Sequence, residues 1–560
     1  MENSYYRKTS RFLKKITLSV CFFISWALYC EEVEINYCFK KVHSLDPGTL
    51  HFFLNNNSKN EIKVEKLYFN DIEIEEGQET DDIFWWTQVP NVALPGQVSN
   101  IMIKIKKILS LPVKIKLKLN TGQFLEKHID SLVPEFFRIS SISFDITENK
   151  VYIYLENNFP NKTIEISDIF VNKKSILNSV KKLSKFILPG EKICIVYSSF
   201  EKINPNQYIP IKVITQDGMI TGALPRVYNY FPIQSFGEDK RKEMFFNEDN
   251  FDIHFPTDIK KFENYKCEPL YKVYHLFDDP VCTDEKRGFL GATAKEVIKR
   301  RKICWEKDPF HPTFIYICEY CKPRGYFIYS ELADIIGVDP YELVYYNNPP
   351  EQDGYYVELG KKSAAPRPIV AIPEAFKYIT KKFPLGCKRF PTPEEERILV
   401  YSEIAAGAKG LWYFTSSGEI GYKNEPKLEK EISKINKEIQ YLKEYLVIGE
   451  PMDISKTDSQ SVKADAIFCG DKGIVIIVRN GDYRTTFDKE KNEWITNVEK
   501  PGKINIFVTL PLWVSYQIET IASIVDKDIL PFKKDYRRII IEKEMVEIAE
   551  PILIKFKKEI

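Results

Sequence analysis

The sequence lacks the short motifs that would assign a common chemistry. It contains no P-loop, no G-x-G-x-x-G fingerprint and no H-E-x-x-H motif, and the absence of G-x-S-x-G disfavours a serine hydrolase. It also lacks a charge excess, because 80 Lys and Arg residues oppose 79 Asp and Glu residues and leave a net charge of +1. The basic residues are spread along the chain rather than clustered, so we expect no nucleic-acid partner.

The cysteines lack the regular spacing of a dense disulfide framework, although the chain has 11 of them. Cys267 and Cys282 are candidates for one bridge. The pair Cys318 and Cys321, close to Cys304, has a spacing that zinc sites use. Because Cys318 falls inside a predicted strand, we interpret it as a buried structural thiol. We therefore predict no metal and no cofactor.

The sequence also lacks a comfortable transmembrane run, since its N-terminal uncharged stretch, residues 16–30, is too short. Basic residues precede this stretch, and Glu31 and Glu32 follow it at once, which is typical of a signal peptide. A lipidated Cys30 and an uncleaved anchor are the alternatives. We predict that residues 1–30 are a signal peptide or signal anchor. The protein would then be exported (periplasmic, cell-surface or extracellular) and would touch a membrane only through this leader.

An internal repeat is present in the first part of the chain. Between its marks apolar and charged residues alternate, as in residues 113–119, which indicates strands with one buried face. We predict two tandem β-sandwiches, residues 31–135 and 136–225. They resemble the immunoglobulin-like modules of secreted bacterial proteins. The recurring pairs, always in the same order, are residues 54–57 and 155–158, residues 64–70 and 166–172, and Gly96 and Gly190.

The middle of the chain, residues 226–448, alternates apolar strands with helical stretches, which is typical of parallel β/α architecture. Too few residues precede residue 272 for three further strand–helix units, so we predict a partial or degenerate β/α (TIM-like) barrel. Residues 449–560 return to short strands and predict a C-terminal β-sandwich. The predicted strands of the barrel are residues 272–277, 313–318, 335–338, 368–372 and 410–414, and the predicted helices include residues 293–305, 394–406 and 426–446.

Residues 391–414 give the clearest local signal. Thr392 suits the N-cap, Pro393 suits the first helical position, and Glu395 completes a capping box. Gly410 then introduces a short apolar strand that ends in small polar residues. A capped helix that leads into a buried strand is the repeating unit of a β/α barrel, whose strands end in the loops that carry catalytic residues.

Polar residues follow the predicted parallel strands where each strand ends. Carboxylates at one rim suit glycosidic bond cleavage, in which one acid protonates the leaving oxygen and a second carboxylate attacks or activates water. Aromatic residues, 14% of the chain, could stack on a sugar ring there, although large cores also use them. An isolated acid at such a turn is often an N-cap or an ion-pair partner, but recurrence at successive strand ends favours a site. The candidates are Asp278, Asp279, Glu319, Asp339, Tyr341, Glu374, Trp412 and, within its strand, His275.

The phrases YHLFDDP, VAIPEAF and TPEEERILVYSEIAAGAKGLWYF make residues 272–422 similar to the later strands of TIM-barrel glycoside hydrolases, including β-galactosidase-like retaining enzymes. The resemblance implies that Asp279, or its neighbour Asp278, is the general acid/base and that Glu374 is the nucleophile. The family usually has Glu in place of Asp279, and the shorter side chain withdraws the carboxyl group by one methylene. The residues that would line the sugar site are His275, Glu319, Asp339, Tyr341 and Trp412.

The sequence leaves two functions open. The first is an exported glycoside hydrolase-like enzyme that acts on a polysaccharide or oligosaccharide by two-carboxylate chemistry. The second is a non-catalytic carbohydrate-binding or surface structural protein built on a degenerate barrel. Both predict a carbohydrate partner, and neither predicts an oligomeric state.

Overall fold

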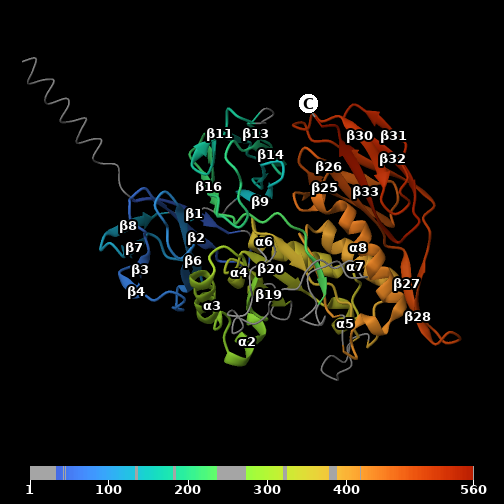
Figure 1. The fold of residues 1–560 in the computed structure, drawn as a ribbon, viewed down its shortest axis with the longest axis horizontal. Helices are drawn as coiled ribbons and strands as arrows, with labels where there is room; N and C mark the ends of the chain where they lie inside the picture. Colours follow the sequence, from blue (N-terminus) through green and yellow to red (C-terminus); the bar gives the residue numbers. More distant parts are fainter. Residues whose placement is uncertain are drawn as a thin grey trace, which may run out of the picture.

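The chain is described from a computed structural model, which combines many antiparallel strands with one parallel sheet (Figure 1). The structure describes residues 33–558 apart from 42, 45, 131, 133–135, 181–184, 236–272, 319–323, 378–387 and 416–417. The predicted leader therefore lies outside the described residues. Within the described part, no helix is both long and apolar enough to cross a membrane.

The N-terminal strands form two antiparallel sheets around one apolar core, drawn in blue in Figure 1. The alternation predicted for residues 113–119 is confirmed, because the apolar residues of this strand are buried and the lysines between them are partly exposed. The two sheets have the orders β1 (Val33–Lys40), β2 (Thr49–Asn56), β6 (Val98–Ile105), β5 (Ile83–Val89) and β4 (Ile72–Ile74), β3 (Val64–Phe69), β7 (Val113–Leu119), β8 (Phe124–Ile129).

The following strands form a second pair of antiparallel sheets with a separate apolar core. One sheet has the order β14 (Lys192–Ser198), β10 (Lys150–Asn157), β9 (Phe137–Asp145). The other has the order β12 (Lys174–Ser175), β11 (Ile164–Val171), β15 (Ile211–Thr215), β16 (Ile220–Ala223), with β13 (Phe186–Ile187) also paired to β11.

The predicted repeat between these two regions is confirmed by one shared arrangement of hydrogen bonds. Asn56 ends β2 and Asn157 ends β10, and both side chains are fully buried. Each side-chain amide donates to two backbone carbonyls, at 2.7 and 2.8 Å for Asn56 and at 2.8 and 2.9 Å for Asn157. Each side-chain oxygen accepts the backbone N–H two residues later. Gly96 and Gly190 close the matching turns at φ of 78° and 72°.

The middle of the chain contains a six-stranded parallel sheet. Five strands lie where the sequence predicts them, and β17 adds a sixth that pairs with β22. Within the described residues β17 and β18 form the two edges of the sheet, which is therefore an open half-barrel. The order of strands is β17 (Ile233–Ser235), β22 (Leu411–Tyr413), β21 (Ile369–Ala371), β20 (Ile335–Asp339), β19 (Thr313–Cys318), β18 (Tyr274–Phe277).

The last part of the chain forms two antiparallel sheets and a hairpin, and its core is continuous with one face of the parallel sheet. The boundaries of the predicted domains stay predictions. The first sheet is β23 (Glu450–Met452), β25 (Val462–Cys469), β26 (Gly473–Asn480), β33 (Ala549–Phe556), β30 (Ile518–Ser523). The second sheet is β24 (Ser455–Thr457), β29 (Lys503–Thr509), β32 (Arg538–Glu544), β31 (Phe532–Asp535), and the hairpin is β27 (Tyr483–Asp488), β28 (Glu493–Val498).

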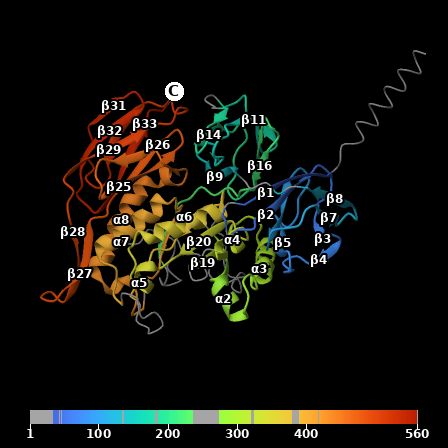
Figure 2. The ribbon, with the colours of Figure 1, turned by 180° about the vertical axis from the view of Figure 1, so that it is seen from behind.

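Helices cover one face of the parallel sheet and join it to the last strands, as Figure 2 shows for α7 and α8. The predicted capping box is confirmed, since Thr392 accepts the N–H of Glu395 at 3.2 Å and Glu395 accepts the N–H of Thr392 at 2.9 Å. The helices are α2 (Pro280–Arg287), α3 (Ala294–Lys307), α4 (Arg324–Tyr329), α5 (Glu342–Tyr346), α6 (Gln352–Ala364), α7 (Pro393–Ala405) and α8 (Pro426–Leu446), with a short 3-10 helix, η2 (Tyr422–Asn424).

Candidate active site at the carboxyl end of the parallel sheet

One face of the parallel sheet is lined by aromatic side chains. Successive residues of a strand point to opposite faces, so Phe314 and Tyr316 share a buried cluster with Trp412, whereas Ile315 joins the helix-covered core. The ring centroids of Phe314 and Tyr316 lie 5.4 and 5.6 Å from that of Trp412. A Cβ at Gly337 would approach the Phe314 ring to 2.6 Å, so this glycine leaves room for the aromatic cluster.

Two further candidates for sugar binding, His275 and Tyr341, belong to the same aromatic cluster. The ring of His275 lies 4.5 Å from that of Tyr316. Burial lowers the pKa of His275 to about 4, so the imidazole is neutral at neutral pH. The ring of Tyr341 lies 5.2 Å from that of Phe376 and 5.6 Å from that of Phe414. The strands thus gather residues that are far apart in the sequence on one aromatic surface.

Three predicted carboxylates meet at the carboxyl end of this sheet. Asp278 and Asp279 follow β18, and Asp339 is the last residue of β20. The strand between them aligns the group, because Cys318 stands opposite Asp339 in the register and donates its backbone N–H to Oδ1 of Asp279 at 3.4 Å. Three neighbouring strand ends therefore hold the acids beside one another.

The environment of Asp339 favours the protonated carboxyl group. Desolvation, followed by the negative charges of Asp279 and Asp278, raises the pKa of Asp339 well above its ordinary value. Its Oδ1 has no hydrogen-bond partner among the described residues. Asp278 is exposed, and desolvation and Asp279 raise its pKa as well. A desolvated acid that keeps its proton beside an acid that reaches solvent is an arrangement that acid–base catalysis uses.

Glu374 lies in a different environment. Its side chain is fully buried, and its two oxygens accept the backbone N–H groups of Leu343 and Val344 at 2.7 and 2.8 Å. These N–H groups open α5, where unpaired donors and the helix dipole favour a carboxylate. Glu374 thereby holds the start of α5 and, with it, Tyr341, which precedes the helix at φ of 51°.

Two thiols touch each other beside the carboxylates. Sγ of Cys282 lies 3.4 Å from Sγ of Cys318, and these atoms and a carboxylate oxygen of Asp279 all lie within 4.8 Å of one another. Such atoms could share a metal ion, but the contact between the thiols accounts for their proximity by itself. Cys267 and Cys321, the other members of the candidate bridge and of the zinc-like pair, lie outside the described residues.

The sequence did not identify Tyr316 and Cys318 as members of this site. Both are reached by counting every second residue of β19, because that spacing keeps side chains on one face of a strand. Glu319, which follows Cys318 and was predicted to line the sugar site, lies outside the described residues. The described site therefore consists of the acids at the ends of β18 and β20, the thiol pair and the buried aromatic cluster.

No protein-family model matches this sequence, and no curated protein matches it. The chain is similar to the solved structure of an alpha-fucosidase from Thermotoga maritima, with 11% identity, 47% of this chain and 49% of that chain covered, and a TM-score of 0.26. It thus spans about half the length of that fucosidase.

Two other solved structures are similar to parts of this chain. A cycloisomaltooligosaccharide glucanotransferase from Paenibacillus sp. has 9% identity, with 74% of this chain and 99% of that chain covered and a TM-score of 0.37. Alpha-L-fucosidase isoenzyme 1 from Paenibacillus thiaminolyticus has 11% identity, with coverage of 53% and 60% and a TM-score of 0.28. At TM-scores this low the likeness is loose, and it defines neither the fold nor the activity of this chain.

Proposed function

We propose that this protein is an exported glycoside hydrolase-like enzyme that cleaves a polysaccharide or oligosaccharide at the carboxyl end of its parallel sheet. The observation that carries the proposal is the meeting of Asp278, Asp279 and Asp339 at neighbouring strand ends, where the surroundings favour a protonated Asp339. Cleavage of a glycosidic bond requires such a pair, in which one group is a proton donor and the other an ionised carboxylate. Export rests on the predicted leader alone.

In this proposal Asp339 is the general acid that protonates the leaving oxygen. Desolvation, followed by the charges of its two acidic neighbours, raises its pKa well above the ordinary value, which favours the protonated group. Asp278 or Asp279 is the second carboxylate, which attacks the anomeric carbon or activates water. The assignment differs from the one that the family resemblance implies, which places the acid on Asp279.

The sugar is proposed to contact His275, Tyr341 and Trp412 at the edge of the aromatic cluster, in which Tyr341 and Trp412 are buried. These rings belong to the cluster that ends beside Asp339, so a stacked sugar would bring its glycosidic oxygen toward the carboxylates. Glu319 keeps its predicted place in this sugar site because it follows Cys318 directly.

For Glu374 the resemblance proposes the role of nucleophile, whereas its two backbone hydrogen bonds favour a positioning role. The variant Glu374→Gln separates these roles. Loss of a nucleophile removes turnover, and added azide restores it by attacking the sugar in place of the carboxylate. Loss of a positioning residue lowers turnover together with the thermal midpoint, and azide has no effect. We expect the second pattern.

The activity is tested by measuring reducing-sugar release from a panel of plant and bacterial polysaccharides. Hydrolysis should fall by about 100-fold or more in Asp339→Asn, since general acid catalysis contributes that much. The double variant Asp278→Asn/Asp279→Asn should be equally impaired. Glu358→Gln is the matched control, because this acid is exposed on α6 and forms an ion pair with Lys362. Equal activity in all four proteins would refute the proposed site.

The open sheet favours a second candidate, a non-catalytic carbohydrate-binding protein. Among the described strands, β17 and β18 each have one neighbour in the parallel sheet, so the described part of the sheet does not form the closed barrel that supports most sites of this kind. Binding of a glycan on an array without release of reducing sugar would favour this candidate, and turnover would exclude it.

A further inference from the structure

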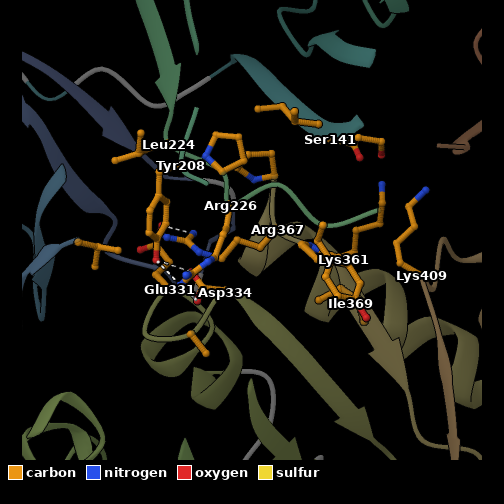
Figure 3. Close-up of a pocket in the computed structure, with 18 of the residues that line it drawn as sticks. Ser141, Tyr208, Leu224, Arg226, Glu331, Asp334, Lys361, Arg367, Ile369 and Lys409 are labelled. Carbon is orange, nitrogen blue, oxygen red and sulfur yellow. Dashed lines mark hydrogen bonds and ion pairs between the residues drawn. The ribbon is translucent and has the colours of Figure 1, made fainter. Parts of the chain in front are cut away.

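A cavity lies at the opposite, amino end of the parallel strands. Segments that lead into β17, β20, β21 and β22 form its floor, and β9 of the second pair of sheets lies across it. Its empty volume is about 800 Å³, part of which is open to solvent. Figure 3 shows its side chains in two groups, with Arg226, Arg367, Glu331 and Asp334 at one end and Lys361 and Lys409 at the other.

The cavity carries an excess of positive charge. Two of its lining residues are acidic, Glu331 and Asp334. Five are basic, and these are Arg226, Arg301, Lys361, Arg367 and Lys409. One of the five, Lys361, forms an ion pair with the buried Glu450, which is not itself a lining residue.

Both acids are already engaged by other groups. Asp334 lies 3.4 Å from Nη1 of Arg226 and also accepts the backbone N–H and the hydroxyl of Thr313. Glu331 lies 3.5 Å from Nζ of Lys40 and 3.2 Å from Nε2 of His51, while Nη1 of Arg367 is 4.0 Å away. Among the lining cations, the two acids thus pair with Arg226 and Arg367, and Asp334 also acts on Arg301.

Arg301 is a buried cation of this cavity, and one of its hydrogen-bond donors is unsatisfied among the described residues. It is 5% exposed, and the hydrogen bonds recorded for it run to neutral groups, the Thr87 hydroxyl and the Gln88 carbonyl. Its Nη1 has no hydrogen-bond partner within the described part of the chain. Lys409 likewise donates to two backbone carbonyls, those of Leu446 and Gly449. A buried donor without an acceptor, such as Nη1 of Arg301, is costly, and a bound anion would supply that acceptor.

We infer that this cavity binds an oxyanion group, that is, a phosphate, a sulfate or the carboxylate of an acidic sugar. Arginine presents a planar set of donors that matches such groups, and lysine adds a point charge. Ser141 and Ser143 of β9 add hydroxyl donors on the other side of the cavity. The site is separate from the proposed catalytic end of the sheet, so either proposal can fail without the other.

Calorimetric titration of the full chain tests the inference, with phosphate, sulfate and glucuronate as probes and glucose as the neutral control. Ionic strength is held at about 100 mM with chloride, so that weak surface attraction is screened. We expect saturable binding of at least one anion and none of glucose. Preference for phosphate or sulfate would indicate a free oxyanion, and preference for glucuronate would indicate a sugar-borne carboxylate.

Variants identify the cavity as the binding site. Arg367→Gln and Lys409→Gln should each weaken binding by about tenfold or more, because each removes a charged donor. Ser141→Ala leaves every ion pair intact and should weaken binding by a smaller factor. This variant tests the cavity even if Arg367→Gln or Lys409→Gln fails to fold. Lys362→Gln, an exposed charge removal on the same helix as Lys361, should leave binding unchanged. The inference would be overturned by the absence of saturable binding, or by an affinity in all three cavity variants equal to that of the unmodified protein.

Discussion

The two ends of the parallel sheet carry opposite charge. Asp278, Asp279 and Asp339 gather at the carboxyl end, where desolvation, followed by the charge of Asp279, raises the pKa of Asp278 and of Asp339. The amino end gathers cations, of which Arg226 is paired with an acid and Lys409 is held by carbonyls. The surroundings thus favour a protonated acid at one end and gather cations at the other. Removing a charge, or raising the pH, should therefore change the stability of the protein in opposite directions at the two ends.

The largest expected effect is at the amino end, where Arg226 is paired with Asp334. Arg226→Met should lower the free energy of unfolding by about 3–5 kcal/mol, because the partner is left as a buried charge. Chemical denaturation measures this change. Lys503→Met, which breaks an exposed pair with Glu542, should have no measurable effect. Equal changes in the two variants would remove the contrast between buried and exposed cations.

A second test uses the pH dependence of Lys409. Burial lowers the pKa of this lysine from 10.5 to about 8, so the folded protein releases the proton before the unfolded chain does. Stability should therefore rise as pH increases from about 8 to 10.5, by up to about 3 kcal/mol from this group. Thermal midpoints of the protein and of Lys409→Met across this range measure it. If the stability of Lys409→Met still rises with pH over this range, another group causes the rise.

The smallest effect, with the opposite sign, is expected at the carboxyl end. Asp339 has a raised pKa in the folded protein, so the folded form holds its proton where the unfolded chain has lost it. Its contribution to stability is complete below pH 3.8 and declines as pH rises toward the folded pKa. Asp339→Asn should flatten this decline and raise the thermal midpoint at neutral pH. A lower midpoint in the variant would mean that the ionised carboxylate stabilises the fold.

The sequence predicted the carboxyl end of the sheet far better than the amino end. Acids that directly follow apolar runs, such as Asp278 and Asp339, can be read as strand ends, because strand and loop are adjacent in the sequence. The helix cap at Thr392 was equally local. By contrast, the amino-end cavity draws Arg301 from the middle of a helix and Arg367 from a turn before a strand. No local pattern marks such residues, since only packing brings them together.

The sequence also could not predict the environment of a residue whose hydrogen-bond partners are backbone groups far away in the sequence. Glu374 follows a strand as expected, but the N–H groups that it accepts belong to α5, about thirty residues earlier in the sequence. The position of α5 therefore changes the candidate role of Glu374 from nucleophile to positioning residue. The pairing of β17 with β22 could not be predicted for a similar reason. β17 has only three residues, and its partner is the last strand of the sheet along the chain.

The most direct measurement is the loss of activity in Asp339→Asn on two substrates with the same sugar, a natural oligosaccharide and a dinitrophenyl glycoside. A general acid is needed only where the leaving group is poor, so we predict a fall of about 100-fold or more in kcat/KM for the oligosaccharide and little change for the dinitrophenyl glycoside. Equal losses on both substrates, or no loss on either, would contradict the assignment of Asp339 as the proton donor of this sheet.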